Sequence, residues 1–224
     1  MAKNVNANIS NQAPFAVVEA YKNIRIRLLY ILENMKGKVI AFTSPNVSEG
    51  KSTTAVNMAI TLSQLNKKIL LIDGDIRRAT IHKKLKIENT RGLSNILARE
   101  CQFGEAVNSY NSYLDVLTSG SVVVNPSDLI GSTDFDKLIE KVKDEYDYII
   151  IDTPPVNIVS DALSISKKCD GVVLVARIAY TTYAQLKTAT NALKALDINV
   201  LGTILNGAGG TKKKYGSYYK YGYK

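Results

Sequence analysis

The chain has 224 residues, of which 46% are apolar, and this length and composition suit one α/β domain with a sizeable core. Its formal net charge is +9, but five of the positive charges lie in residues 212–224. The remaining +4, without a basic helix, argues against general nucleic-acid binding by the body of the chain. Two distant cysteines match no metal or redox spacing, and a single histidine argues against a zinc site.

A polar arm and a helix are the first elements expected along the chain. Residues 1–14 are polar and lack the apolar segment of a signal peptide, which predicts a flexible arm. From 15 to 35, apolar residues recur near helical spacing and predict an N-terminal helix. Glu19, Lys22 and Arg25 fall three apart on another flank of this helix, as a solvated face or a contact surface.

An alternation of strands and helices follows and sets the fold class. Apolar runs predict strands at 38–44, 67–73, 114–120, 146–152, 171–176 and 199–205. Helical patterns between them lie at 51–65, near 92–99, at 132–145, near 160–168 and at 182–196. Runs such as "YIIID" are continuously apolar, which is typical of strands covered by helices on both faces. We therefore predict a single α/β domain with a doubly wound, mainly parallel sheet.

The turn "TSPNVSEGKSTT" is the first candidate part of a site. Its Gly50, Lys51 and Ser52 offer backbone amides at a helix N-terminus, a lysine for phosphate oxygens and a hydroxyl for Mg²⁺. Pro45 stands where the standard phosphate-binding loop has its first glycine, so the match to that pattern is partial.

Two further strand ends carry acidic residues. In "ILLIDGDIRR" an apolar strand runs into Asp73 and Asp75, which by themselves could be helix caps. In "YIIIDTPP" the buried strand ends at Asp152, whose carboxylate needs a partner such as Mg²⁺. Ligands of open α/β sheets bind where strands end, so the three segments together predict nucleotide binding.

The three segments together resemble the Walker A, A′ and B motifs of the bacterial tyrosine kinases of the capsular and exopolysaccharide type. "EAYKNIR" near the start, "NPSDLIGS" at 125–132 and the tyrosine-rich tail extend the resemblance over nearly the whole chain. It implies a P-loop NTPase-like kinase domain at 15–210, related to the MinD and ParA ATPases, and a disordered tail at 211–224. It also implies ATP and Mg²⁺ as cofactors.

The resemblance implies a role for each motif residue. Lys51 would neutralise the transferring phosphate, and Asp73 would accept or orient the phenol proton of a tyrosine. The Mg²⁺ ligands would be Ser52, Asp75 and Asp152, so the catalytic set would be Lys51, Asp73, Asp75 and Asp152. The ATP-binding residues would be Ser48, Glu49, Gly50, Lys51, Ser52, Thr53 and Asn206. Asn206 would contact adenine, although an Asn-Gly pair is equally typical of a turn.

The resemblance also implies partners. The flank of Glu19, Lys22 and Arg25 resembles the E-x-x-R-x-x-R self-association motif, with lysine in place of the first arginine, and implies a ring-like homo-oligomer. A transmembrane adaptor of the polysaccharide co-polymerase type would activate the kinase through its cytoplasmic segment. Protein substrates such as polysaccharide-synthesis enzymes and a cognate phosphotyrosine phosphatase would complete the set. The chain would be cytoplasmic and recruited by its adaptor to the inner face of the cell membrane.

The tail "KKKYGSYYKYGYK" is the expected site of autophosphorylation between subunits. The acceptor tyrosines would be Tyr215, Tyr218, Tyr219, Tyr221 and Tyr223. Two alternatives remain at this stage. A positioning ATPase of the MinD or ParA kind shares the predicted sheet, but such proteins typically carry a further lysine where this chain has Asn46. A binding module could instead grip RNA or an anionic polymer through the basic, aromatic tail.

Overall fold

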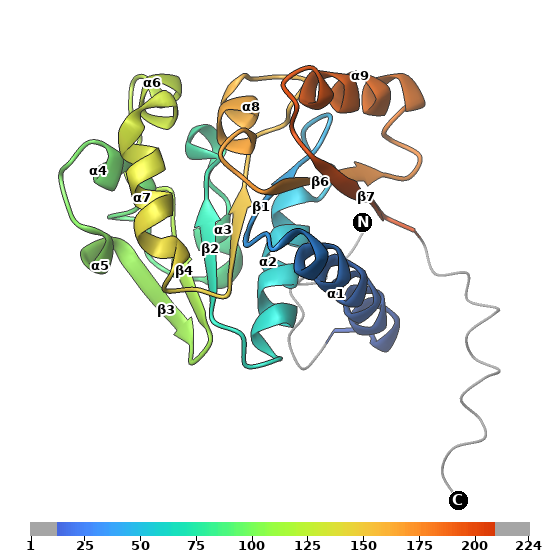
Figure 1. Ribbon diagram of the computed structural model, residues 1–224, viewed down its shortest axis with the longest axis horizontal. Coiled ribbons are helices and arrows are strands. Elements are labelled where there is room, and N and C mark those ends of the chain that lie inside the picture. Colours follow the sequence, from blue (N-terminus) through green and yellow to red (C-terminus); the bar gives the residue numbers. More distant parts are fainter. Residues whose placement is uncertain (1–12, 209–224) are drawn as a thin grey trace, which may run out of the picture.

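The computed structural model describes residues 13–208 (Figure 1), so most of the predicted arm and the predicted tyrosine tail lie outside the described residues. The strands are β1 (Val39–Thr43), β2 (Ile69–Asp73), β3 (Val107–Asn111), β4 (Leu114–Leu117), β5 (Tyr148–Asp152), β6 (Gly171–Arg177) and β7 (Val200–Asn206). The helices are α1 (Phe15–Met35), α2 (Lys51–Ser63), the 3-10 turn η1 (Ile76–Arg78), α3 (Ile81–Leu85), α4 (Leu93–Leu97), α5 (Phe103–Ala106), α6 (Pro126–Gly131), α7 (Thr133–Lys143), α8 (Asp161–Ser166) and α9 (Tyr183–Lys194).

The strands form one sheet in the order β3-β4-β2-β5-β1-β6-β7. Every neighbouring pair is parallel except β3 and β4, which pair antiparallel at one edge. Strands β1 and β2 are consecutive in the chain but are not neighbours in the sheet, because β5 lies between them. The predicted doubly wound, mainly parallel sheet in a single domain is confirmed.

Helices cover both faces of the sheet, which explains why its central strands are apolar along their whole length. Ile40 and Phe42 of β1 pack into the core layer beneath α1, α2 and α3. Val39 and Ala41, which point the other way, pack into the layers beneath α4 to α9. Figure 1 shows the two layers, with α6, α8 and α9 along the top of the view and α1 at the lower right.

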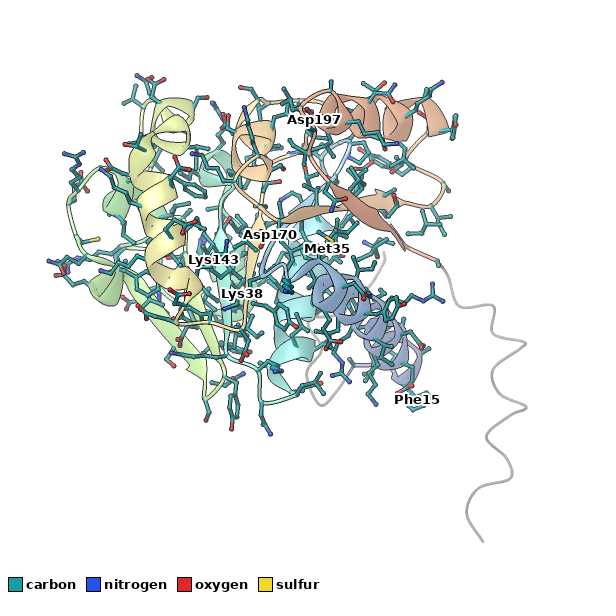
Figure 2. The ribbon with its side chains drawn as sticks, viewed as in Figure 1. Phe15, Met35, Lys38, Lys143, Asp170 and Asp197 are labelled. Atoms are coloured by element: carbon teal, nitrogen blue, oxygen red, sulfur yellow. The ribbon has the colours of Figure 1, made fainter. Side chains whose placement is uncertain are left out.

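The amino-terminal edge of the sheet is held together by Asp170, the residue before β6. Its Oδ2 accepts hydrogen bonds from the backbone N–H of Lys38 at 2.7 Å and of Val39 at 2.8 Å. The Nζ of Lys38 also donates to the carbonyl of Lys143 at the end of α7, at 3.4 Å. Figure 2 shows the three side chains close together in the middle of the view. This contact fixes the start of β1 against β6.

The sequence predictions differ from the structure at the β3 edge. The strand "VNSYN" at 107–111 was not predicted, because it is polar and largely exposed and therefore has no apolar pattern. The strand predicted at 114–120 ends at Leu117, since the backbone carbonyls of Thr118 and Ser119 accept from the first amides of α4. The short helices α3, α5 and α6 were also missed. Within residues 13–208, no helix combines the length and hydrophobicity needed to cross a bilayer.

Candidate active site

The predicted strand ends meet at the carboxyl edge of three adjacent strands. Because β2, β5 and β1 are neighbours, the end of each strand delivers its loop to the same place. The register pairs Asp73 of β2 with Asp152 of β5, and Asp152 with Phe42 of β1, just before the loop at 44–50. The structure therefore brings the three motifs together.

A cleft of about 430 Å³ opens above this edge. Its walls are made by Ser44, Asn46, Val47, Ser48, Glu49, Gly50, Lys51, Ser52, Thr53, Asp75, Arg78, Thr80, Lys84 and Pro155. Every predicted ATP-binding residue of the loop lines this cleft. Asp73 and Asp152 do not; both are fully buried and lie beneath it.

The loop from 44 to 50 is held in a fixed conformation by its own contacts. Ser48 and Gly50 have φ angles of 62° and 92°, which turn backbone amides inward at the N-terminus of α2. The buried Glu49 carboxylate accepts from the Asn46 backbone N–H at 2.8 Å and from the Thr181 hydroxyl. Glu49 therefore shapes the loop with its side chain. Pro45, the departure from the standard pattern, does not prevent the loop from forming.

Asn206, at the end of β7, reaches the same loop. Its Nδ2 donates to the carbonyl of Glu49 at 3.0 Å, and its Oδ1 accepts from the backbone N–H of Gly207 at 2.8 Å. A Cβ on Gly50 would lie 1.8 Å from the Asn206 Nδ2. Only glycine therefore fits at position 50. Asn206 both braces the phosphate loop and forms the turn that follows, while its contact with adenine stays a prediction.

Lys51 lies among the acidic groups of the site. Its Nζ is 2.7 Å from Asp152 Oδ1, 3.6 Å from Asp75 Oδ2 and 3.2 Å from Ser52 Oγ. The other oxygen of Asp152, Oδ2, is buried and has no hydrogen-bond partner among the described residues. A cation thus belongs among these oxygen atoms, and in this structure the ammonium group takes that role.

These oxygens fit Mg²⁺. Carboxylate and hydroxyl oxygens are its preferred ligands, and Mg²⁺ is usually bound through one or two carboxylates together with substrate phosphates. Between residues 13 and 208, no cluster of three or more acidic, histidine or cysteine side chains able to enclose a metal occurs. Ser52, Asp75 and Asp152 are the residues that would hold the ion.

Asp73 is buried beneath α3. Its Oδ2 accepts from the backbone N–H of Thr80 at 3.1 Å and of Ile81 at 3.0 Å, while its Oδ1 has no partner among the described residues. Burial and then the charge of Asp152 raise the pKa of Asp73 to about 7. A carboxylate with this pKa can exchange a proton near neutral pH.

Arg77 links the segment that follows Asp75 to helix α8. Its Nε is 2.6 Å from Asp161 Oδ2 at the start of α8, and the Ser127 hydroxyl of α6 donates to Asp161 Oδ1 at 2.6 Å. Burial alone would raise the pKa of Asp161, but the bonds from Arg77 and Ser127 outweigh it and hold the pKa below its usual range. The sequence showed Arg77 and Ser127 within quoted motifs and gave no signal for Asp161.

Sequence reasoning missed the wall formed by α3 and the residues before it. Arg78, Thr80 and Lys84 all line the cleft, and burial lowers the pKa of Lys84. It also missed Arg177 at the end of β6, whose Nη1 donates to the Ser48 carbonyl at 3.2 Å. In "ATIHKKLKI" nothing distinguishes Lys84 from its exposed basic neighbours, so only the fold identifies it.

The charged flank of α1 lies away from the cleft. Lys22 Nζ is 2.8 Å from Glu19 Oε1 on the same helix. Arg25 Nη1 donates to the carbonyl of Thr61 on α2 at 2.7 Å, so this arginine stabilises the packing of two helices within the chain. The proposed contribution of Glu19, Lys22 and Arg25 to self-association stays a prediction.

The chain is similar to known proteins along most of its length. Residues 37–199 match a family described as an AAA domain. Tyrosine-protein kinase YwqD of Bacillus subtilis is 38% identical over 206 residues, which cover 92% of this chain and 85% of YwqD. Among solved structures, the kinase domain of Escherichia coli tyrosine kinase ETK gives a TM-score of 0.86 at 30% identity and covers 100% of this chain and 87% of that one. The chimerical protein CapA2B2 gives 0.81 at 33% identity, with coverages of 88% and 86%.

Proposed function

The chain belongs to the bacterial tyrosine-protein kinases, and we propose that it transfers the γ-phosphoryl group of ATP to protein tyrosines, its own tail first. The observation that carries this proposal is the meeting of Lys51, Asp75 and Asp152 under one phosphate-binding loop, with Asp73 beside them. Asp73 is buried beside these groups, and its Oδ1 has no hydrogen-bond partner among the described residues, so it is the member of the set that would act on the phenol proton.

The phosphate loop and α2 would bind the nucleotide. The loop amides and the N-terminus of the 13-residue helix α2 attract phosphate oxygens. Lys51 would exchange its contact with Asp152 for one with the terminal phosphates, which frees the carboxylates of Asp75 and Asp152 and the hydroxyl of Ser52. Mg²⁺ held by these residues would neutralise negative charge on the phosphates.

The transfer itself is a displacement at phosphorus. The tyrosine oxygen forms a bond to the γ-phosphorus, the bond from that phosphorus to the β,γ-bridging oxygen breaks, and ADP leaves with its electron pair. Asp73 would accept or orient the phenol proton; it lies beneath the cleft, and its Oδ1 has no hydrogen-bond partner among the described residues. Such reactions depend mostly on alignment and charge neutralisation, so Lys51 would matter at least as much as the base.

The acceptors would be the tail tyrosines of a neighbouring subunit. They are Tyr215, Tyr218, Tyr219, Tyr221 and Tyr223, all outside the described residues. The ring-like homo-oligomer that brings tail and cleft together would use the α1 flank of Glu19, Lys22 and Arg25. Support for a surface role comes from the same helix, whose Ile26 and Tyr30 are 63% and 70% exposed.

The cellular setting follows from the resemblance to kinases of polysaccharide operons. We propose a cytoplasmic protein held at the inner face of the membrane by a transmembrane adaptor, whose cytoplasmic segment promotes productive binding of ATP. A phosphotyrosine phosphatase would reverse the modification, and polysaccharide-synthesis enzymes would be further substrates. The output would be control of capsule or exopolysaccharide synthesis and export.

Mass spectrometry of the full chain tests the activity. After incubation with Mg-ATP and the adaptor's cytoplasmic peptide, phosphotyrosine is expected in residues 215–223 of the wild type and greatly reduced in Asp73→Asn, which keeps the shape of the site. If ATP is hydrolysed rapidly and no tyrosine is modified, the kinase proposal is wrong and a positioning ATPase of the MinD kind is the better description.

A further inference from the structure

Lys84 is a second lysine in the cleft, and it comes from a different element than Lys51. It lies on α3, one helical turn after Thr80, whose backbone carbonyl accepts from the Lys84 N–H at 3.2 Å. Its Nζ donates to the Thr53 hydroxyl at 2.8 Å across the cleft. The side chain therefore spans from the α3 wall to the first turn of α2.

The position of Lys84 is electrostatically unusual. The first turn of α2 carries the positive end of the helix dipole, which disfavours a cation and favours an anion. Burial lowers the pKa of Lys84, Asp152 and Asp73 favour its charged form, and Lys51, which begins the same helix, opposes it. Lys84 and Lys51 thus bring two ammonium groups to one cleft, and an anionic ligand attracted by the α2 N-terminus would meet both of them.

The direction of approach indicates which part of the ligand Lys84 meets. Helix α3 begins directly above Asp73, whose Oδ2 accepts from the backbone N–H of Ile81. Lys84 lines the same cleft as Lys51 and Asp75, which are proposed to surround the transferring phosphoryl. Asp152, Lys51 and Asp73 are also near enough to shift the pKa of Lys84. The same wall carries the hydroxyl of Thr80, which is buried and has no hydrogen-bond partner among residues 13–208.

We propose that Lys84 binds the terminal phosphate of ATP and, with Lys51 on the opposite wall, neutralises the phosphoryl group that is transferred. On binding, its ammonium would leave the Thr53 hydroxyl for a γ-phosphate oxygen. The role of Lys84 in phosphoryl transfer rests on the proposed function, whereas its contact with the γ-phosphate requires only that the chain binds ATP. Lys84 would thus distinguish ATP from ADP, because only ATP has the phosphate it reaches.

The test compares Lys84→Met with Lys83→Met. Lys83 is exposed on the same short helix and does not line the cleft, so it controls for the loss of one positive charge on α3. Calorimetry on the full chain would measure the Kd of a non-hydrolysable ATP analogue and of ADP, each with Mg²⁺. A charge-assisted hydrogen bond contributes enough that Lys84→Met should weaken analogue binding about tenfold to a hundredfold. ADP binding should change less than about threefold, and Lys83→Met should leave both unchanged.

Three results would overturn the inference: unchanged analogue binding in Lys84→Met, equal weakening for both nucleotides, or equal effects in the two variants. Lys84→Arg, which keeps the charge, should recover most of the affinity. Matching thermal unfolding midpoints would show that the variants are folded. If the wild type binds the analogue but never forms phosphotyrosine, the proposed function is wrong. The Kd values of Lys84→Met and Lys83→Met would still test whether Lys84 binds the terminal phosphate.

Discussion

Replacing Lys51 by methionine should lower the free energy of unfolding and should also stop phosphoryl transfer. The Lys51 side chain is 8% exposed and that of Asp152 is 0% exposed, with 2.7 Å between Nζ and Oδ1. Methionine fills similar space but leaves the Asp152 carboxylate buried without its cation, directly beside Asp73 in the sheet. Removing one partner of a buried pair costs about 3–5 kcal/mol, so we expect a loss of that size in the free energy of unfolding.

Urea denaturation of the nucleotide-free protein in EDTA at pH 7.5 measures this loss. The set comprises the wild type, Lys51→Met, Asp152→Asn and the double variant, in which no unpaired charge remains. The double variant should be clearly more stable than Lys51→Met, because asparagine removes the buried charge. Burial already raises the pKa of Asp152, so the loss in Lys51→Met should shrink as the pH falls and the carboxyl takes up a proton. A loss below about 1 kcal/mol, or strictly additive effects, would refute the reasoning.

Three further variants probe separate parts of the site. Gly50→Ala should weaken ATP binding and destabilise the fold by roughly 1–3 kcal/mol, because φ is 92° and the new Cβ collides with Asn206; unchanged calorimetric affinity would contradict this. Asp73→Asn should remove a pH dependence of stability. Burial raises the pKa of Asp73 to about 7, so the free energy of unfolding of the wild type should fall by up to about 4 kcal/mol as the pH rises from 4 to 7. The variant should therefore be the more stable protein in urea unfolding at pH 8. Asp161→Asn should lower the free energy of unfolding by about 1–3 kcal/mol at pH 7 and leave it unchanged well below pH 4, because the pKa of Asp161 is depressed and only its ionised carboxylate stabilises the fold. An equal loss of stability in thermal melts at pH 3 would argue against the bond to Arg77.

The fold was predictable because the central strands of a doubly wound sheet are apolar on both faces. Val39–Thr43 and Tyr148–Asp152 are fully buried, so their composition alone indicates their place. The edge strand Val107–Asn111 has no such signal, since its stability comes from backbone pairing with β4. Hydrophobic patterns therefore predict buried strands, but they do not predict an exposed strand that is held only by backbone hydrogen bonds.

The positions of the motif residues in the site were predictable, but the contacts between them were not. Motif order placed Lys51 and the aspartates at one edge, but it could not show that Lys51 holds Asp152. Nor could it distinguish Lys84 from Lys83, because whether a basic residue faces the cleft depends on how α3 sits on β2. Contacts between distant segments are decided by packing, so they must be read from the structure.

Asn206 links the end of β7 to the loop at 44–50. It is the last residue of β7, and its amide holds the Glu49 carbonyl next to Gly50 at 3.0 Å. Tyr215, the first of the proposed acceptor tyrosines, follows nine positions later in the sequence. Tension on the segment that carries these tyrosines, whether from docking into a neighbour or from repulsion between added phosphates, would act on the phosphate loop through one side chain. The strand that precedes the proposed acceptor tyrosines therefore ends in contact with the loop proposed to bind ATP.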